Sequence, residues 1–382
     1  MNDLATRDYQ LPDNIQDLSK FVLIGREKLT AVRAEIRAIN KVGLAQEVRG
    51  QKLKEAQDIA EAVLDAEVRI GELTAKIPKA QGFASSIRDI TVANAKNKTE
   101  EIKEAGITPK QAQRFEELAR HPEAVEQAKE EARANDEIVT RSSVLNKVKF
   151  EKKKEEIRRA EQAIAEQAHE ECKPRLFIGD STKEDMNLFT FDLLLTDPPY
   201  STDVDDIVDF VDTWLFKTLE SVKPTGFAYI FIGAYPKEVK TYLNAETPGH
   251  IKLEQILVWT YKNTLGNNPK GRYKQNYQCC LFYKGVDAPD LDCPLTSEQW
   301  AVQEINAPDG RQGDRYHAWQ KPMEIAERFI RHSTKPGMTV FDPFACTGTF
   351  LLAASKLGRR AYGYEINPEN AKIAAERGCV IE

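Results

Sequence analysis

The sequence predicts an α/β domain that follows an all-helical N-terminal region. Up to about residue 173 the chain is rich in Glu, Lys, Ala, Arg and Gln, and its apolar residues recur at helical spacing. After Pro174 the pattern changes to short apolar runs bounded by turns, which is typical of alternating strands and helices. We therefore divide the chain into residues 1–173 and 174–382, since 382 residues suffice for two domains that each bury a core.

Composition restricts the class of protein. The formal net charge of −6 means that any contact with nucleic acid must come from local basic patches. The six cysteines show no C-x-x-C spacing, which favours a reducing compartment and argues against a zinc site. The Asp-rich stretch 203–212 has the spacing of an acidic first helical turn, so we expect no metal there. No apolar run approaches the ~18 residues of a membrane span, and we expect a cytoplasmic protein without membrane contact.

Residues 18–77 carry apolar positions at helical spacing, which predicts a helical bundle or a coiled hairpin. A homodimer through these helices is one assembly that the pattern allows. Between residues 141 and 160 eight side chains are basic and three are acidic, as in a solvated connecting helix or a strut that faces phosphates.

A second helical motif follows a glycine turn. Thr108 is placed as an N-cap, Gln111 completes a capping box, and a proline occupies the first helical position. The helix over 109–119 would present Lys110 and Arg114 outward, where they are candidate DNA contacts. The shape is that of a helix-turn-helix, although an ordinary αα-hairpin has the same pattern.

The sequence after residue 173 predicts seven strands, with helices between several of them. We expect strands at Arg175–Ile178, Phe191–Leu195, Phe227–Ile232, Leu253–Thr260, Tyr277–Tyr283, Met338–Phe341 and Ala361–Tyr364, and helices at Ile207–Val222, Pro322–His332 and Phe350–Leu357. The strands at 253–260 and 277–283 are separated only by a loop, and we expect them to form an antiparallel hairpin that closes the sheet.

Two motifs each follow one of these strands. The first is Asp-Pro-Pro-Tyr at 197–200, and the second is Asp-Pro-Phe-Ala-Cys-Thr-Gly-Thr at 342–349. Each places a carboxylate and a proline turn at a strand end, which is where open α/β sheets bind ligands. The first motif suits a planar amine and the second suits a nucleoside cofactor.

The chain from Arg175 onward resembles the amino-methylating, S-adenosylmethionine-dependent DNA methyltransferases, in the circularly permuted arrangement that places the catalytic motif before the cofactor motif. Five pieces in family order carry this resemblance: Ile178-Gly179-Asp180-Ser181, Asp197-Pro198-Pro199-Tyr200, Gln320-Lys321-Pro322, Asp342 to Thr349, and Gly363 to Pro368. The resemblance implies a Rossmann-like methyltransferase sheet over just over half of the chain.

The resemblance assigns catalysis to Asp197, Pro198, Pro199 and Tyr200. An exocyclic amine on an aromatic base is a poor nucleophile because its lone pair is delocalised into the ring. The Asp197 carboxylate and the Pro198 carbonyl would accept its two N–H hydrogens and draw the nitrogen towards tetrahedral geometry. Tyr200 would stack on the base, which must be flipped out of the duplex.

The expected cofactor is S-adenosylmethionine. Residues expected to contact it are Asp180, Ser181, Lys321, Asp342, Phe344, Cys346, Gly348, Thr349 and Glu365. Glu365 would accept the ribose hydroxyls, Gly348 would allow close backbone approach, and Lys321 is implied near the methionine carboxylate. The family commonly has glycine where this chain has Cys346.

The expected partner is double-stranded DNA. From Trp259 to Gly285 the chain has no acidic residue, and the candidate DNA contacts there are Lys262, Lys270, Arg272 and Lys274. The alternative is an ordinary hairpin with a solvated tip.

The predicted activity is transfer of a methyl group to the adenine amino group of DNA, since aspartate before Pro-Pro-Tyr favours adenine in this family. The cytosine amine and RNA are alternative substrates. A helix-turn-helix protein with an inert transferase domain is the alternative of a different class. Without a nuclease motif, the pattern is that of a stand-alone bacterial or phage methylase, either an orphan enzyme or part of a restriction–modification system.

Overall fold

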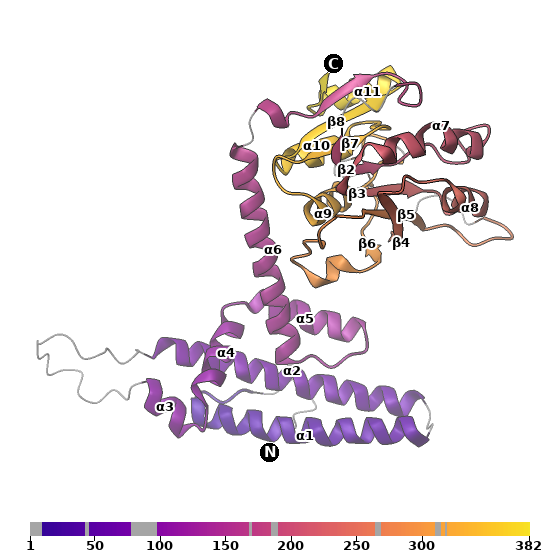
Figure 1. Cartoon of the computed structure of the whole chain (residues 1–382). Coiled ribbons are helices and arrows are strands. Elements are labelled where there is room, and N and C mark those ends of the chain that lie inside the picture. The colour runs from indigo at the N-terminus through magenta and orange to yellow at the C-terminus, as the bar shows by residue number, and fades with distance from the viewer. Residues whose placement is uncertain are drawn as a thin grey trace, which may run out of the picture. The chain divides into compact units, whose positions relative to one another are not determined.

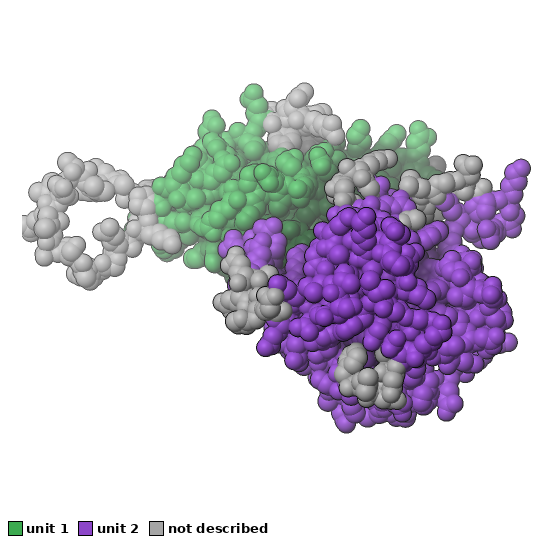
Figure 2. All heavy atoms as spheres, turned by 90° about the horizontal axis from the view of Figure 1, so that it is seen from above, with its two compact units in different colours: residues 1–154 green, residues 155–382 purple. Residues whose placement is uncertain are grey.

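The computed structural model describes residues 10–42, 46–77, 98–167, 170–184, 190–263, 269–309, 315–317 and 319–382. The chain forms two compact units, residues 1–154 and residues 155–382 (Figure 2). In the part of the chain that the structure describes, no helix is both long enough and apolar enough to cross a membrane.

The N-terminal unit is helical, as predicted. Its helices are α1 (Ile15–Val42), α2 (Gln46–Lys76), α3 (Lys98–Glu104), α4 (Pro109–Ala119), α5 (Pro122–Ala134) and the first half of α6 (Arg141–Gln167) (Figure 1). Helices α1 and α2 pair as a long hairpin whose core contains Leu18, Val22, Ile59 and Val63. Amphipathic helices of this length bury one apolar face and leave the other to charged residues.

Helix α4 begins where the capping pattern predicts. The Thr108 hydroxyl accepts a hydrogen bond from the Gln111 backbone N–H at 3.2 Å, and the Gln111 side chain accepts one from the Thr108 N–H at 2.9 Å. Phe115 faces inward and is buried, whereas Lys110 and Arg114 are exposed. The helix therefore presents its basic residues outward, as expected from the sequence.

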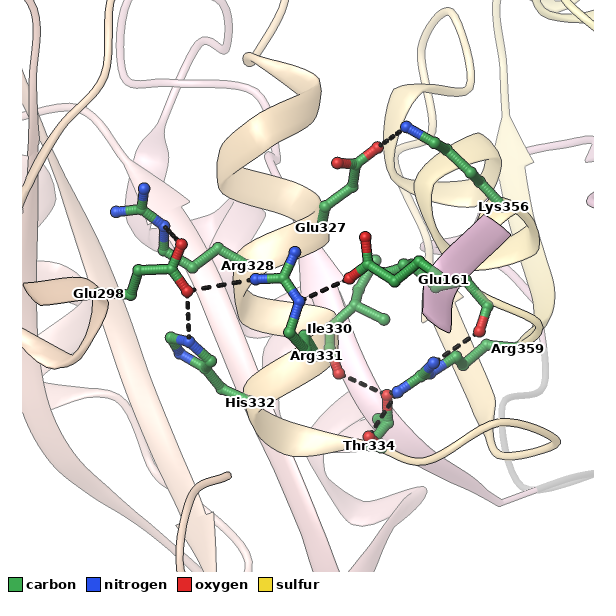
Figure 3. Close-up of polar contacts among 11 residues, drawn as sticks. Glu161, Glu298, Glu327, Arg328, Ile330, Arg331, His332, Thr334, Lys356 and Arg359 are labelled. Atoms are coloured by element: carbon green, nitrogen blue, oxygen red, sulfur yellow. Dashed lines mark hydrogen bonds and ion pairs between the residues drawn. The ribbon is translucent and has the colours of Figure 1, made fainter. Parts of the chain in front are cut away.

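The two units divide within α6, between Lys154 and Glu155, and not at residue 173. The reason is that the second half of this helix packs with the C-terminal unit. The Arg331 guanidinium donates to Glu161 at 2.6 Å and also forms an ion pair with Glu298 (Figure 3). Behind this contact the buried Arg359 guanidinium donates to the Thr334 hydroxyl at 2.9 Å.

The C-terminal unit is a Rossmann-like α/β fold. Its strands are β1 (Arg175–Ile178), β2 (Phe191–Thr196), β3 (Val222–Ile232), β4 (Ile251–Thr260), β5 (Tyr277–Gly285), β6 (Val302–Glu304), β7 (Thr339–Asp342), β8 (Arg360–Glu365) and β9 (Val380–Ile381). Its helices are α7 (Ile207–Glu220), α8 (Pro236–Asn244), α9 (Met323–Ser333), α10 (Thr349–Lys356) and α11 (Pro368–Glu376), with 3₁₀ turns at Glu170–Cys172 and Thr296–Gln299.

Within the described residues the sheet has nine strands in the order β6-β4-β5-β3-β2-β7-β8-β1-β9. Strand β5 runs antiparallel to both β3 and β4, so the predicted hairpin is present, and the other strand pairs are parallel. Strands β6 and β9 have three and two residues, too short to leave a periodic signal in the sequence. The helix expected to reach Val222 ends at Glu220 because Val222 already belongs to β3.

Helices cover both faces of this sheet. Trp214 of α7 and Tyr242 of α8 pack in one apolar core, and Phe329 of α9 and Phe350 of α10 pack in the other. Strand β2 lies between the two cores and all six of its residues are buried. A central parallel strand covered on both faces is the usual setting for a ligand site at its carboxyl end.

One glycine allows the N-terminal helices to pack closely. At Gly71 in α2, an added Cβ would overlap the backbone carbonyl of Phe115 in α4. We predict that Gly71→Ala destabilises this unit by about 1–3 kcal/mol, because the two helices would have to move apart. Chemical denaturation followed by circular dichroism measures the change.

Gly50 is the matched control, since it lies in the same helix with nothing within 4 Å of the added Cβ. Gly50→Ala should stabilise the unit by about 0.5–1 kcal/mol through helix propensity alone. If the two variants had the same effect, close packing at Gly71 would not contribute to stability.

Candidate active site

The candidate site lies where the order of strands in the sheet reverses. Strand β2 pairs with β3 on one side and with β7 on the other. After β2 the chain continues to β3 on one side of the sheet, and after β7 it continues to β8 on the other side. The Thr196 hydroxyl at the end of β2 donates to the Asp342 carboxylate at the end of β7, at 2.7 Å. A cavity of about 880 Å³ is located at these two strand ends. This is the position at which open α/β sheets bind ligands.

Asp197 is the centre of a polar cluster in this cavity. Its Oδ1 accepts a hydrogen bond from the Tyr200 hydroxyl at 2.7 Å, and its Oδ2 accepts one from the Lys321 ammonium. Lys321 also donates to the Tyr200 hydroxyl, at 3.0 Å. Burial and the charge of Asp197 raise the pKa of Tyr200, so its hydroxyl keeps the proton that it donates.

Lys321 is held deep in the C-terminal unit. Its side chain is 2% exposed, and its Nζ lies 5.3 to 5.8 Å from the ring centres of Tyr200, Phe231 and Trp259. It directly precedes Pro322, the N-cap of α9. A buried ammonium is costly unless it is paired and hydrogen-bonded, and here a carboxylate, a hydroxyl and three aromatic rings supply those contacts.

The chain forms a tight turn directly after Tyr200. The Tyr200 N–H donates to the Asp203 carboxylate at 3.0 Å, and the Asp203 N–H donates to the Tyr200 carbonyl at 2.8 Å. Asp206 is the N-cap of α7 and accepts from the Val208 N–H at 2.7 Å. The Asp-rich stretch is therefore a helix start, and the described residues contain no cluster suited to a metal ion.

The second motif forms a tight loop between β7 and α10. The Asp342 carboxylate accepts from the Phe344 N–H at 3.1 Å, and it is 2% exposed. Burial raises its pKa to about 7, and nearby carboxylates, including Glu365, contribute. Cys346 has φ of 49°, a left-handed conformation that favours glycine, which explains the glycine common in the resembling family. Burial also raises the pKa of the Cys346 thiol to about 12, so it stays protonated.

Glu365 ends β8 beside this loop. Its Oε2 accepts from the Cys346 N–H at 2.7 Å, and its Oε1 accepts from the Asn367 N–H at 2.8 Å. Two backbone donors thus orient the carboxylate, which lines the cavity. The Asn370 side-chain amide also donates to Oε1, at 3.4 Å, so Oε2 is the oxygen that keeps a lone pair for a further donor.

Gly348 has a packing role in addition to the one expected from the sequence. Its φ is 77°, and an added Cβ would contact Cys379 Sγ at 2.6 Å and Ala374 Cβ at 3.2 Å. The absence of a side chain therefore lets the loop pack against α11, and close approach of a cofactor to Gly348 stays a prediction. Arg377, which the sequence did not single out, donates to the Thr347 carbonyl at 2.6 Å and to the Thr349 hydroxyl at 3.0 Å, and so braces the loop.

The cavity brings together most of the residues expected at the site. All four residues of the 197–200 motif line it, as do Asp180, Ser181, Lys321, Asp342, Phe344, Cys346, Thr349 and Glu365. The basic candidates Lys262, Lys270, Arg272 and Lys274 lie outside it on the β4–β5 hairpin, and Lys110 and Arg114 belong to the N-terminal unit. No sequence signal would have identified Arg377, because an arginine near a helix end is common.

The wall of the cavity is strongly acidic. Its described acidic residues are Asp180, Asp197, Asp203, Asp205, Asp206, Asp209, Asp342 and Glu365, against one lysine, Lys321. Apolar surface comes from Phe344, Tyr364 and Ile366. Acidic groups beside apolar and aromatic faces suit a ligand that is partly apolar and positively charged, and S-adenosylmethionine has both properties.

Comparison with known proteins shows what this part of the chain is similar to. Residues 191–376 match the N6/N4 DNA methylase family. The chain is 26% identical over 239 residues to the type II methyltransferase M.HpaI of Haemophilus parainfluenzae, covering 53% of this chain and 73% of that protein. It is 26% identical over 227 residues to the type II methyltransferase M.BglII of Bacillus subtilis, covering 48% of this chain and 62% of that protein.

Solved structures that align with this chain have low sequence identity to it. The PvuII DNA methyltransferase (cytosine-N4-specific) aligns with a TM-score of 0.47 and 20% identity, covering 54% of this chain and 88% of that one. The M1.HpyAVI–SAM complex aligns with a TM-score of 0.43 and 21% identity, covering 53% of this chain and 98% of that one. The family match over residues 191–376 lies within the C-terminal unit, which is therefore similar in sequence to the S-adenosylmethionine-dependent DNA methylases that act on exocyclic amines.

Proposed function

We propose that this protein methylates the exocyclic amine of adenine in double-stranded DNA. The observation that carries the proposal is the cluster of Asp197, Tyr200 and Lys321 in the same cavity as the loop at 342–349 and Glu365. The proposed acceptor for the amine and the proposed binding site for the nucleoside would then lie side by side at one sheet edge. Aspartate at the head of the Pro-Pro-Tyr motif supports adenine over cytosine, by the resemblance described above.

The proposed role of Asp197 is to accept one N–H of the target amine. The Pro198 carbonyl would accept the other, and because proline has no N–H, this position offers only an acceptor. The two contacts would localise the nitrogen lone pair for attack. Such preorganised polar contacts account for much of enzymatic rate enhancement. The Tyr200 ring would support the flipped base by stacking.

For the cofactor, we propose that Glu365 accepts the ribose hydroxyls and that Asp180 and Phe344 bind the adenine end. When bound, S-adenosylmethionine supplies a methyl group on a positively charged sulfur. The loop of Cys346 and its neighbours would hold the rest of that molecule through backbone N–H groups near the start of α10. The acidic wall would further stabilise the positive charge.

DNA would bind outside this acidic cavity. Lys262, Lys270 and Arg272 are exposed on the β4–β5 hairpin, while Gln275 and Gln278 of the same hairpin line the cavity. Phosphate contacts on the hairpin would therefore place a duplex beside the cavity mouth. We further propose that Lys110 and Arg114 in α4 contact the duplex, and that helices α1 and α2 support a dimer.

Analysis of the product tests the proposal. Duplex DNA of many sequences, treated with the full chain and S-adenosylmethionine and digested to nucleosides, should contain N6-methyladenine by mass spectrometry. N4-methylcytosine alone would replace the adenine assignment with the cytosine one. Methylation of RNA but not DNA would overturn the proposed substrate, and no methylated base at all would favour the inert-domain alternative.

We predict that Asp197→Asn lowers the rate of methyl transfer by ~100-fold or more, because it weakens an acceptor that acts on the reacting amine. The variant should still bind S-adenosylmethionine, which isothermal titration calorimetry measures. Near-normal turnover in a folded Asp197→Asn protein would show that the amine is bound elsewhere.

The buried Asp342 carboxyl should make stability depend on pH. Its pKa is about 7 in the fold, against an ordinary value of 3.8. Its contribution to stability is therefore fully present below about pH 4 and is lost as the pH rises through about 7. Relative to Asp342→Asn, which cannot ionise, the wild-type melting temperature should fall between pH 4 and pH 7 and stay level above that range.

Thermal melts of both proteins without cofactor measure this difference. The asparagine retains an oxygen that accepts from Thr196 and Phe344, so the comparison isolates the ionisation of one carboxyl. Curves for the two proteins that remained parallel across this range would mean that the Asp342 carboxyl is not perturbed.

A further inference from the structure

A second carboxylate lies behind the site, and nothing above assigns it a role. Glu238 of α8 is 0% exposed. Its Oε2 accepts a hydrogen bond from the Ser201 N–H at 2.8 Å, and its Oε1 accepts one from the Gly233 N–H at 2.5 Å. It does not line the cavity, so it does not face a ligand there.

These two hydrogen bonds join the turn after β2 to the end of β3. Ser201 follows Tyr200 in the turn after β2, and Gly233 follows directly after β3. Gly233 has no Cβ, and an added one would lie 2.9 Å from Glu238 Oε2 and 2.6 Å from the Tyr235 ring. The absence of a side chain at Gly233 thus leaves room for the carboxylate.

A buried carboxylate carries a large desolvation cost. Burial raises the pKa of Glu238, and in the described part of the chain its hydrogen bonds come from the Ser201 and Gly233 backbone N–H groups and the Ser201 hydroxyl, not from lysine or arginine side chains. An apolar residue at this position would avoid the cost. We therefore explain the carboxylate by its geometry, because its two oxygens accept hydrogen bonds from two backbone N–H groups that converge on it.

The geometry points to Glu238 as a positioning residue for the catalytic loop. We infer that it holds the backbone at Ser201 and thereby the placement of Tyr200, whose own N–H is held on the other side by Asp203. Tyr200 in turn donates to Asp197. Glu238 would thus control how the base is held without touching it, and this inference rests on the proposed function.

Glutamine is the informative replacement because it has nearly the same shape. A carboxylate has two acceptor oxygens for the two N–H donors, whereas an amide has one oxygen and presents an NH₂ group to the second donor. Glu238→Gln should therefore loosen one end of the bridge with little change in volume. Displacement of catalytic groups by about 1 Å typically costs ~100-fold in rate.

The test compares Glu238→Gln with wild type in the full chain. Single-turnover methyl transfer to duplex DNA should slow by about 10- to 100-fold, while the affinity for S-adenosylmethionine stays within about twofold. In a Tyr200→Phe background the same substitution should cost less, because effects that act through one group are not additive.

Glu298→Gln is the matched control. Glu298 is also a largely buried carboxylate of this unit, it pairs with Arg331 and His332 (Figure 3), and it does not line the cavity. Its loss should lower the melting temperature without slowing methyl transfer. Equal slowing in both variants would mean that Glu238 contributes only general stability, and the inference would fail.

Amide hydrogen exchange over residues 197–204 tests the role of Glu238 independently of the proposed function. If wild type methylates no nucleic acid, the proposed function fails, whereas faster exchange of this segment in Glu238→Gln than in Glu298→Gln would still support the bridge. Unchanged exchange, or an unchanged rate of methyl transfer in an active enzyme, would overturn the positioning role.

Discussion

The ion pair between the buried Lys321 and the partly exposed Asp197 is the interaction on which the geometry of the site depends. The two residues are far apart in sequence, and their contact joins the start of α9 to the end of β2. Because Lys321 is almost fully buried, it requires the carboxylate, and the carboxylate is in turn fixed by the lysine and by Tyr200. Breaking such a pair leaves an uncompensated buried charge. The fold therefore strongly favours this arrangement of the two side chains over others.

The remaining parts of the site follow from the strand order. Placing β2 beside β7 brings Asp197 and Asp342 to the same sheet edge, and the hydrogen bond from Thr196 joins the two strand ends. Several carboxylates then face one cavity, and burial together with their repulsion raises the pKa of Asp342. A positively charged cofactor would relieve this repulsion. The same negative potential would keep phosphates out of the cavity, consistent with placing DNA contacts on the hairpin.

Much of this was predictable because strand ends and proline turns leave clear local patterns. The seven longer strands, the capping box at Thr108 and the convergence of the two motifs all follow from short stretches of sequence. Long-range partners leave no such pattern. The contact of Lys321 with Asp197, the bridge from Glu238 and the packing of Gly348 against α11 depend on side chains brought together only by the fold.

The role of Lys321 tests this account most directly. Its ammonium contacts Asp197 in the structure, whereas the family resemblance implies a position near the methionine carboxylate. The measurement is the dissociation constant for S-adenosylmethionine together with the single-turnover rate for Lys321→Met, with Glu365→Ala as the reference for lost cofactor affinity. We expect Lys321→Met to bind the cofactor almost as wild type does and to transfer methyl groups at least ~10-fold more slowly. A large loss of cofactor affinity with an unchanged rate at saturation would contradict the account.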